Sequence, residues 1–432
     1  MEKTKKLPTK SILATRLVPI LFITYSIAYL DRANFSFGLA GGMQQTLKIT
    51  PEILSILSAV FFLGYFIFQI PAAAYAEKKS AKKLVFWSMI IWGFLAIATG
   101  LVTNYKILFV IRFLLGVVES AVAPALIILV NQWFVKEERS RANTMFLIGA
   151  PVTILWMSIV SAYLIKFVGW QMMFIIEGLP PLLWAFLWWK LVEDKPSHAK
   201  WLTQDEKNGL ENAFKEEQAG IKQVTNYLEA FKNPIVLLLC LEYFLWALGV
   251  NGLVMWLPSM VKSSGKSIVT AGWLSAIPYA LATIVMLATS RFSDRTGNRK
   301  GVISVSLLIA AICFYGSFLA GPSKFWIAFI LLAIAAAAMY GPYGILFALI
   351  SEILPNSVVG RGSALVNNMG MLGGFAGAYF VGHLNGITGN NAASFKLMAG
   401  SLLLAFAISI VVSVKSPSNK KNIEPVIDPM VQ

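Results

Sequence analysis

The sequence predicts an all-α membrane protein with twelve transmembrane helices in two six-helix, pseudo-symmetric halves and with both termini in the cytoplasm. Three observations support this fold class. Hydrophobic residues make up 57% of the 432 residues and charged residues only 13%, about half the charged fraction of a soluble domain. Long apolar segments recur along the chain, and one charged loop motif occurs twice, half a chain apart.

The twelve spans follow from segment length. A helix needs about 20 mostly apolar residues to cross the hydrocarbon core, because its backbone polar groups must pair within the segment. Nine spans carry little or no charge, at residues 53–76, 84–105, 142–165, 234–261, 267–290, 301–323, 325–351, 362–385 and 392–414. Three more reach this length only with charges inside: 17–40 with Asp31 and Arg32, 107–131 with Arg112 and Glu119, and 170–190 with Glu177.

The distribution of basic residues predicts the orientation of these spans. The N-terminal tail and the loops on its side hold seventeen lysines and arginines, and the opposite loops hold seven. Cytoplasmic loops are enriched in basic residues, so both termini are expected in the cytoplasm. The formal net charge of +15 is therefore mainly a matter of membrane topology, and we expect no nucleic-acid partner.

The longest polar stretch, residues 193–233, divides the chain near its middle. It contains Thr203-x-x-Glu206, which fits a helix capping box. We interpret it as a cytoplasmic linker between an N-terminal six-helix bundle, residues 1–192, and a C-terminal six-helix bundle with a polar tail, residues 234–432. A separate functional domain in the linker is the alternative.

A loop motif repeats at half the chain length. The first copy, after the second span, contains Glu77, Ser80, Lys82 and Lys83; the second, after the eighth span, contains Asp294, Arg295, Gly297 and Arg299, with the two acids 217 positions apart. Parallel six-span repeats are typical of secondary transporters that bind substrate between the halves. The motif resembles the loop of the major facilitator superfamily, although Ser80 stands where that family usually has glycine. The resemblance implies a gating role for these loops.

Four of the charges inside the predicted spans lie in the first and fourth helices. A charge at the bilayer centre costs about 2.5–3.5 kcal/mol even on lenient scales, so Asp31, Arg32, Arg112 and Glu119 are candidates for function. Arg112 and Glu119 lie about two turns apart on one helix face, roughly 10 Å in rise, and Gly116 between them leaves room for a ligand or a neighbouring helix. The alternative is a buried ion-pair network with a purely structural role.

The functional interpretation is proton-coupled anion binding. An arginine can bind a carboxylate through two hydrogen bonds. Burial raises the pKa of an acid and a nearby arginine lowers it, so an anion that occupies the arginine favours proton uptake. Proton and anion would then each improve the binding of the other.

The same residues resemble a narrower family, the anion:cation symporters of the major facilitator superfamily. The similarity rests on Tyr29-Leu30-Asp31-Arg32-x-Asn34, Gly64-Tyr65-x-x-x-Gln69-x-Pro71, Arg112-Phe113-x-x-Gly116-x-x-Glu119 and Asn367-x-x-Gly370-x-x-Gly373-Gly374. It implies that Asp31 and Glu119 carry protons, that Arg32 and Arg112 bind the anion and couple it, and that Tyr29, Tyr65 and Asn367 contact substrate. One departure, Gly149-Ala150-Pro151 in place of a frequent glutamine, leaves room for smaller or more apolar carboxylates.

The sequence thus predicts a transporter and not an enzyme, with no cofactor and no metal. We expect it to import a small organic anion, such as a hexonate, hexuronate, aldarate or another carboxylate, together with protons by alternating access. Its setting would be the bilayer of the bacterial cytoplasmic membrane, as a multi-pass monomer. Multidrug or organic-anion efflux by proton antiport and a non-transporting anion sensor are the alternatives.

Overall fold

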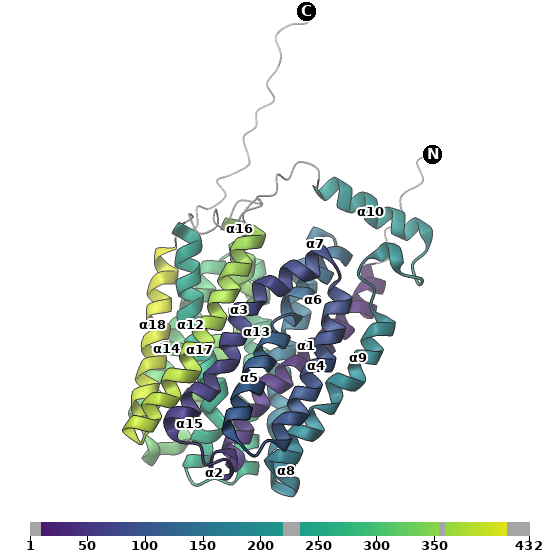
Figure 1. Ribbon diagram of the computed structural model, residues 1–432. Helices are drawn as coiled ribbons and strands as arrows, with labels where there is room; N and C mark the ends of the chain where they lie inside the picture. Colours follow the sequence, from purple (N-terminus) through teal and green to yellow (C-terminus); the bar gives the residue numbers. More distant parts are fainter. Residues whose placement is uncertain (1–9, 219–233, 354–358, 413–432) are drawn as a thin grey trace, which may run out of the picture.

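The computed structural model describes residues 10–218, 234–353 and 359–412, and every regular element in these ranges is helical. Figure 1 shows α10 lying beyond one end of the helix bundle, which we call the α10 end. The elements before residue 219 are α1 (Lys10–Gly38), η1 (Leu39–Met43), α2 (Gln44–Thr46), α3 (Pro51–Lys78), α4 (Ala81–Leu101), α5 (Tyr105–Glu119), α6 (Val122–Trp133), α7 (Lys136–Leu147), α8 (Gly149–Glu177), α9 (Leu179–Leu191), η2 (Pro196–His198) and α10 (Gln204–Gln218). Those after residue 233 are α12 (Pro234–Ser263), α13 (Ile268–Thr296), α14 (Arg299–Ala320), η3 (Pro322–Lys324), α15 (Phe325–Tyr340), α16 (Tyr343–Ile353), α17 (Val359–Thr388) and α18 (Ala392–Val411).

Nine stretches of the described chain are long and apolar enough to cross a membrane. They are Pro51–Lys78, Ala81–Leu101, Tyr105–Trp133, Ala142–Leu191, Pro234–Ser263, Ile268–Thr296, Arg299–Ala320, Phe325–Ile350 and Ala392–Val411. The 50-residue stretch covers two predicted spans, which separate at Gly169, where φ is +82°. Helix α1, of 29 residues, covers the predicted span 17–40 as far as Gly38, and α17, of 30 residues, covers the predicted span 362–385. The chain is a multi-pass membrane protein with a fold made of helices.

Three spans predicted as continuous helices are broken near their middle. Span 107–131 consists of α5 and α6, which separate at Ser120 and Ala121, and span 325–351 consists of α15 and α16, which separate at Gly341 and Pro342. Span 170–190 consists of the end of α8 and of α9, which separate at Gly178. A proline lacks the backbone N–H that would bond to the carbonyl one turn earlier, and Pro124, Pro180 and Pro342 lie at or just after these breaks. Glu119 is therefore the last residue of α5.

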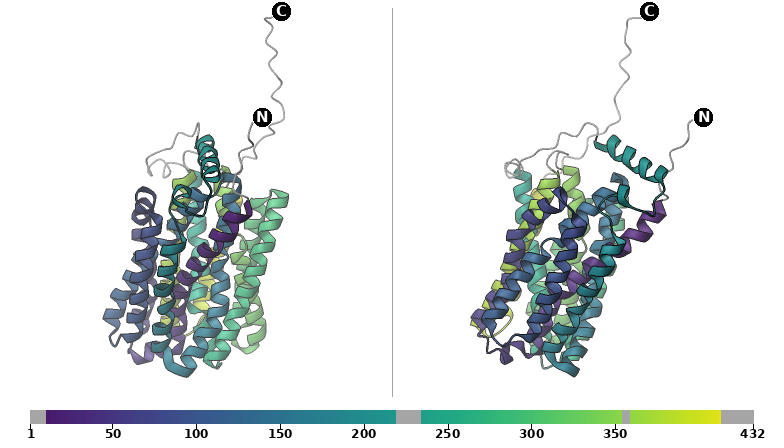
Figure 2. Two further views of the ribbon diagram at one scale, coloured as in Figure 1. Left: turned by 90° about the vertical axis from the view of Figure 1, so that its right-hand side faces the viewer. Right: turned by 45° about the vertical axis from the view of Figure 1, so that its right-hand side comes forward.

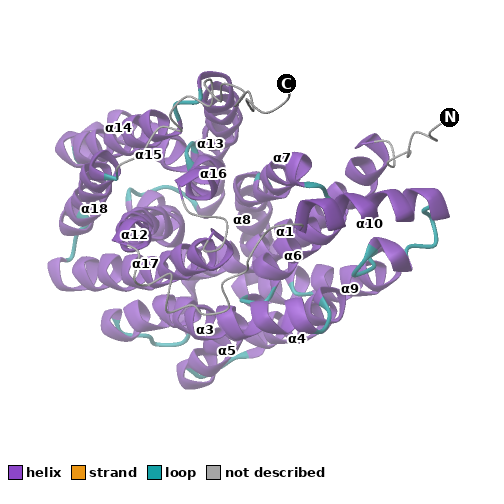
Figure 3. Cartoon of the chain, turned by 90° about the horizontal axis from the view of Figure 1, so that it is seen from above, coloured by secondary structure: helices purple, strands orange, loops and turns teal. Residues whose placement is uncertain are grey.

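The helices pack in a pattern that brings early and late segments of the chain together. Helix α1 packs on α8 and α3 on α5, while α12 packs on α17 and α14 on α15 and α18. Seen from the α10 end, α14, α15 and α18 lie on one side and α4 and α9 on the other (Figure 3). Contacts of α1 with α12, of α3 with α17 and of α8 with α13 join the N-terminal helices (α1–α9) to the C-terminal helices (α12–α18).

The glycines of α17 serve packing within the chain. A β-carbon at Gly373 or Gly377 would collide with the backbone carbonyl of Phe244 or Leu248 in α12. Close approach of small residues is the usual reason for such a glycine pattern in membrane helices. The repeated glycines at four-residue spacing thus lie in an intramolecular helix interface.

Several contacts between the N-terminal and C-terminal helices lie toward the end opposite α10. The Lys262 ammonium group of α12 donates a hydrogen bond to the carbonyl oxygen of Ala40 in η1. Gly272 of α13 packs on Ser158 and Ala162 of α8, and Gly386 of α17 packs on Pro51 of α3. These contacts leave little space between the two groups of helices at that end.

The start of the predicted linker is bound to the N-terminal helices. Lys82 forms an ion pair with Glu193, with its Nζ atom 3.1 Å from Oε2, and Ser80 Oγ donates a 2.6 Å hydrogen bond to Asp194 Oδ2. The indole of Trp201 stacks on that of Trp133 at 5.5 Å. Figure 2 shows α10 following this segment at the α10 end in two further views. The remainder of the predicted linker, residues 219–233, and the predicted polar tail, residues 413–432, lie outside the described residues.

Candidate functional site

The candidate site is centred on the middle of α1. Arg32 and Asp31 are adjacent, and successive residues of a helix point about 100° apart. Arg32 therefore reaches the space between α1 and the C-terminal helices, whereas Asp31 is turned toward the N-terminal helices and is only 3% exposed.

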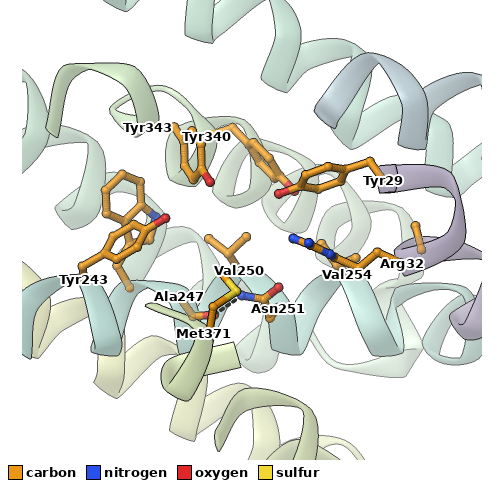
Figure 4. A pocket seen from close by; sticks show the side chains of 12 residues that line it. Tyr29, Arg32, Tyr243, Ala247, Val250, Asn251, Val254, Tyr340, Tyr343 and Met371 are labelled. Atoms are coloured by element: carbon orange, nitrogen blue, oxygen red, sulfur yellow. Dashed lines mark hydrogen bonds between the residues drawn. The ribbon is translucent and has the colours of Figure 1, made fainter. Parts of the chain in front are cut away.

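A small cavity lies between the N-terminal and C-terminal helices. Tyr29, Arg32 and Ala33 of α1 line one side. The other residues that line it are Tyr243, Trp246, Ala247, Val250, Asn251 and Val254 of α12, Tyr340 of α15, Tyr343 of α16 and Met371 of α17. Figure 4 shows the Arg32 guanidinium group and the Tyr243 ring facing this space from opposite sides.

The two predicted arginines occupy different environments. Arg32 is 9% exposed and lines the cavity, whereas Arg112 of α5 is 1% exposed and does not line it. The Arg32 guanidinium carbon lies 4.8 Å from the ring centroids of both Tyr29 and Tyr65. The Arg112 carbon lies 4.1 Å from the ring centroid of Phe35 and 4.9 Å from that of Phe61. Aromatic faces attract such cations, more strongly when both are desolvated.

The side chain of Phe61 in α3 connects the two arginines. Its ring centroid lies 5.6 Å from the Arg32 guanidinium carbon and 4.9 Å from that of Arg112. Helix α3 can come this close to α5 because Gly116 packs on the backbone of Phe61 and Gly64 on the backbone of Phe113. Of the two possible roles for Gly116, the structure supports contact with a neighbouring helix.

The two predicted proton carriers lie beside each other. Asp31 of α1 and Glu119 of α5 are close enough to influence each other electrostatically, and Arg112 acts on both. Glu119 is fully buried, and neither of its carboxyl oxygens has a hydrogen-bond donor among the described residues. The described chain shows no ion pair of 4 Å or less between these acids and Arg32 or Arg112. The site therefore holds two neighbouring carboxyl groups that are not neutralised by close pairing.

Further buried polar groups lie next to this pair of acids. Asn34 of α1 neighbours both Asp31 and Glu177, the last residue of α8. Ser161 Oγ donates a 2.6 Å hydrogen bond to Glu177 Oε1. The sequence identified Glu177 as a charge inside a span without assigning it a role. The structure places it in the same polar cluster as the predicted proton carriers.

The predicted tyrosine contacts lie near Arg32, whereas the predicted asparagine does not line the cavity. Tyr29 lines the cavity, and Tyr65 is buried next to Arg32. Asn367 is half-buried on α17, one helical turn before Met371, which does line the cavity.

The two loop motifs make contacts within their own groups of helices. Ser80 caps the N-terminus of α4, because its Oγ accepts a hydrogen bond from the Lys83 amide at 3.0 Å. Its φ of −165° is extended, so this position does not require glycine. In the second copy Arg299 Nη1 lies 3.3 Å from Asp294 Oδ1, and Gly297 ends α13 with a left-handed φ of +67°. Glu77 and Arg295 are exposed.

The sequence did not identify the aromatic side of the cavity. Its residues include Tyr243 and Trp246 in α12, and Tyr340 and Tyr343 in α15 and α16. Both pairs have a three-residue spacing, which places them on one side of a helix or helix junction. That spacing was the available signal, but aromatic residues in membrane spans ordinarily face lipid or the interface.

The fold and the central cavity define a multi-pass membrane transporter. The family model of the Major Facilitator Superfamily matches residues 21–378 and 243–431. The chain belongs to the Major Facilitator Superfamily, whose members are transporters and not enzymes.

Relatives and solved structures agree with this assignment. The chain is 31% identical to a protein of Agrobacterium vitis named as a tartrate transporter, over 93% of this chain and 90% of the relative. It is also 31% identical to the quinolone resistance transporter of Acinetobacter baumannii, over 94% of this chain and 95% of the relative. The crystal structure of a D-xylose-proton symporter has the same fold, with a TM-score of 0.76 at 15% identity, over 91% of this chain and 97% of that one.

Proposed function

We propose that this protein imports a small carboxylate together with protons by alternating access. The observation that carries the proposal is the position of Arg32, which faces the central cavity while the adjacent Asp31 belongs to the buried acid pair. One turn of α1 thus connects a site for an anion with a site for a proton. The name of the tartrate transporter supports an organic anion as the substrate.

The anion site consists of Arg32 and the tyrosines around it. Arg32 reaches the cavity and makes no ion pair within the described residues. A planar guanidinium group matches a carboxylate through two parallel hydrogen bonds. Tyr29, whose ring lies against the same guanidinium group, brings a hydroxyl group to the cavity.

The proton site consists of Asp31 and Glu119. Two carboxyl groups that share a buried site do not both ionise readily, because like charges repel in a low dielectric. Arg32 acts electrostatically on both acids. Arg32 stabilises negative charge on Asp31 and Glu119. A carboxylate bound to Arg32 weakens this stabilisation, so the two acids bind a proton more easily. Thermodynamic reciprocity requires that a proton on this pair then favours the anion by the same factor.

Alternating access requires two groups of helices that move around the cavity. We propose twelve spans in two six-helix halves, residues 1–192 and 234–432, joined by the linker and acting as a monomer in the bacterial cytoplasmic membrane. With the α10 end in the cytoplasm, as the basic loops predict, the contacts of Lys262 and Gly272 lie toward the outside. These contacts support a state that is closed to the outside.

Efflux of an organic anion by proton antiport is a second candidate. It is favoured by the 31% identity to a quinolone resistance transporter. The same acid pair and Arg32 could serve either direction, because the coupling acts on binding and not on the sign of the flux.

Transport by the purified protein in proteoliposomes tests the proposal. A panel of labelled carboxylates is offered with an inward proton gradient, with an outward gradient and with a collapsed gradient. Symport predicts accumulation under the inward gradient alone, whereas antiport predicts accumulation under the outward gradient. Binding without flux would indicate a sensor. Concentrative uptake that survives in both Arg112→Lys and Glu119→Gln would overturn the coupling scheme.

A further inference from the structure

The charge on the surface of the cavity comes from one residue. Of the twelve residues that line it, Arg32 alone carries a formal charge. Arg112, the second predicted anion-binding residue, is 1% exposed and lies between the rings of its neighbours Phe35 and Phe61 and the buried acids. A ligand in the cavity therefore meets a single cation.

The side of the cavity opposite Arg32 is aromatic and aliphatic. The ring centroids of Tyr243 and Trp246 lie 5.5 Å apart at an interplanar angle of 87°, and those of Trp246 and Tyr343 lie 6.3 Å apart at 79°. The indole N–H of Trp246 donates to the Met339 carbonyl oxygen at 3.0 Å, so it is not available to a ligand. We call Tyr243, Trp246 and Tyr343 the aromatic wall; Figure 4 shows the rings of Tyr243 and Tyr343 on the far side of the cavity from Arg32.

Local packing fixes the aromatic wall in place. Gly370 of α17 lies against the Tyr243 ring, and a β-carbon there would overlap it. Asn251, an uncharged polar residue on this side of the cavity, donates its amide to the Ala247 carbonyl oxygen at 2.9 Å. Val250, Val254 and Met371 complete the apolar lining. This side therefore offers ring faces and aliphatic surface in a fixed position, with the hydroxyl groups of Tyr243, Tyr340 and Tyr343 as its main polar groups.

We infer that the carboxylate of the proposed function is an aromatic monocarboxylate, held with its carboxylate on Arg32 and its ring against the aromatic wall. A second carboxylate on the ligand would be desolvated without a cation, which is costly. A chain of hydroxyl groups would find hydrogen-bond partners only at the tyrosine hydroxyl groups and Asn251, and elsewhere would exchange water for aliphatic surface and ring faces. An aromatic ring gains both apolar burial and favourable ring contacts in the same place.

Two pairs of ligands test separately the charge of the substrate and its carbon skeleton. Benzoate and phthalate differ by one carboxylate on the same ring. Benzoate and gluconate carry the same charge, but one has an aromatic ring and the other a hydroxylated carbon chain. Thermal stabilisation of the full-length protein by each ligand over a concentration series gives the apparent Kd. We expect benzoate to bind at least tenfold more tightly than phthalate, gluconate or tartrate. Equal or tighter binding of any of these three would overturn the inference.

A variant that binds more tightly tests the number of cations in the cavity, because a loss of protein stability cannot produce tighter binding. Asn251→Lys places a second cation in the cavity, and we expect it to improve the affinity for phthalate relative to benzoate at least tenfold. An unchanged ratio in a folded variant would overturn the inference. Trp246→Leu should weaken benzoate and leave gluconate unchanged, with Trp256→Leu as a control, because Trp256 lies on the same helix outside the cavity lining.

Failure of the inference and failure of the proposed function are distinguishable. Tighter binding of tartrate or gluconate with proton-driven uptake would reject the aromatic monocarboxylate and leave carboxylate symport intact. Absence of binding by every carboxylate, in protein that still unfolds cooperatively, would reject both.

Discussion

Gly116 of α5 lies directly against the backbone carbonyl of Phe61 in α3. This contact sets the distance between two helices and thereby holds one phenyl ring close to the guanidinium groups of Arg32 and Arg112. A backbone carbonyl cannot turn aside as a flexible side chain can, so an added β-carbon at position 116 has to separate the helices.

We therefore expect Gly116→Ala to lower the free energy of unfolding by about 1–3 kcal/mol, the usual cost of overpacking. The measurement is thermal unfolding of the purified protein in detergent. Gly400→Ala in α18 is the matched control, because nothing lies within 4 Å of its β-carbon position. Equal melting temperatures for the two variants would show that α3 and α5 adjust without cost.

Arg32 and Arg112 should respond differently to loss of charge. Arg32→Gln removes the cation from the cavity, and hydrogen bonds to charged groups contribute about 1.5–3 kcal/mol, so we expect KM for the transported anion to rise at least tenfold. Arg112→Gln should raise KM less but reduce proton-driven accumulation, because its charge acts on Asp31 and Glu119. Initial uptake rates at several anion concentrations separate the two effects. A larger KM change for Arg112→Gln would assign it to direct anion contact.

Glu119→Gln should separate exchange from accumulation. The amide keeps the shape of a protonated carboxyl group but cannot release a proton. We expect counterflow exchange of labelled anion to continue while accumulation under an inward proton gradient is lost. Loss of both activities would instead indicate a role of Glu119 in binding or folding. Glu242→Gln is the control, since Glu242 is a buried acid in α12 that does not line the cavity.

Gly272→Val should prevent closure of the end opposite α10. A side chain at position 272 meets the backbone of Ser158 and the β-carbon of Ala162 across the contact between α13 and α8. We expect a cysteine placed at Ala33, in a background without Cys240 and Cys313, to react faster with a membrane-impermeant thiol reagent added outside. Gly400→Val in the same background supplies the baseline rate. Unchanged labelling would contradict a closing role for this contact.

Ser80→Gly should destabilise the protein although it restores the residue usual in the superfamily motif. The change removes the 2.6 Å hydrogen bond to Asp194 and the cap on the Lys83 amide. Each contributes about 1 kcal/mol, and we expect a corresponding decrease in melting temperature. Ser80→Thr, which keeps the hydroxyl group, should recover most of the loss. A more stable Ser80→Gly variant would mean that the loop prefers the glycine conformation.

Much of the helix pattern could be predicted because membrane insertion imposes a simple rule. Length and apolar composition located segments that coincide with α3, α4, α12, α13, α14 and α18 within a few residues. The breaks after Glu119, at Gly178 and at Gly341 were missed, because hydropathy does not detect a change of direction within an apolar segment. The prolines at 124, 180 and 342 were the local signal.

The site was predicted in part, for a physical reason. A charge inside the bilayer is rare enough to be informative from sequence alone, so Asp31, Arg32, Arg112 and Glu119 were identified together. All four are buried, but only Arg32 lines the cavity. This division depends on how α1 and α5 are rotated, which sequence does not specify. The aromatic wall was missed because Trp246 and Tyr343 resemble the lipid-facing aromatics of any membrane helix until the tertiary packing is known.

The indole of Trp246 also provides an optical signal. It is fully buried, anchored by its hydrogen bond to the Met339 carbonyl oxygen, and lies in contact with the cavity. An occupant of that space replaces water next to the ring, which changes the emission of the fluorophore without any attached dye. The difference in fluorescence between the parent protein and Trp246→Phe during titration would therefore report occupancy of the cavity at equilibrium and in stopped-flow experiments.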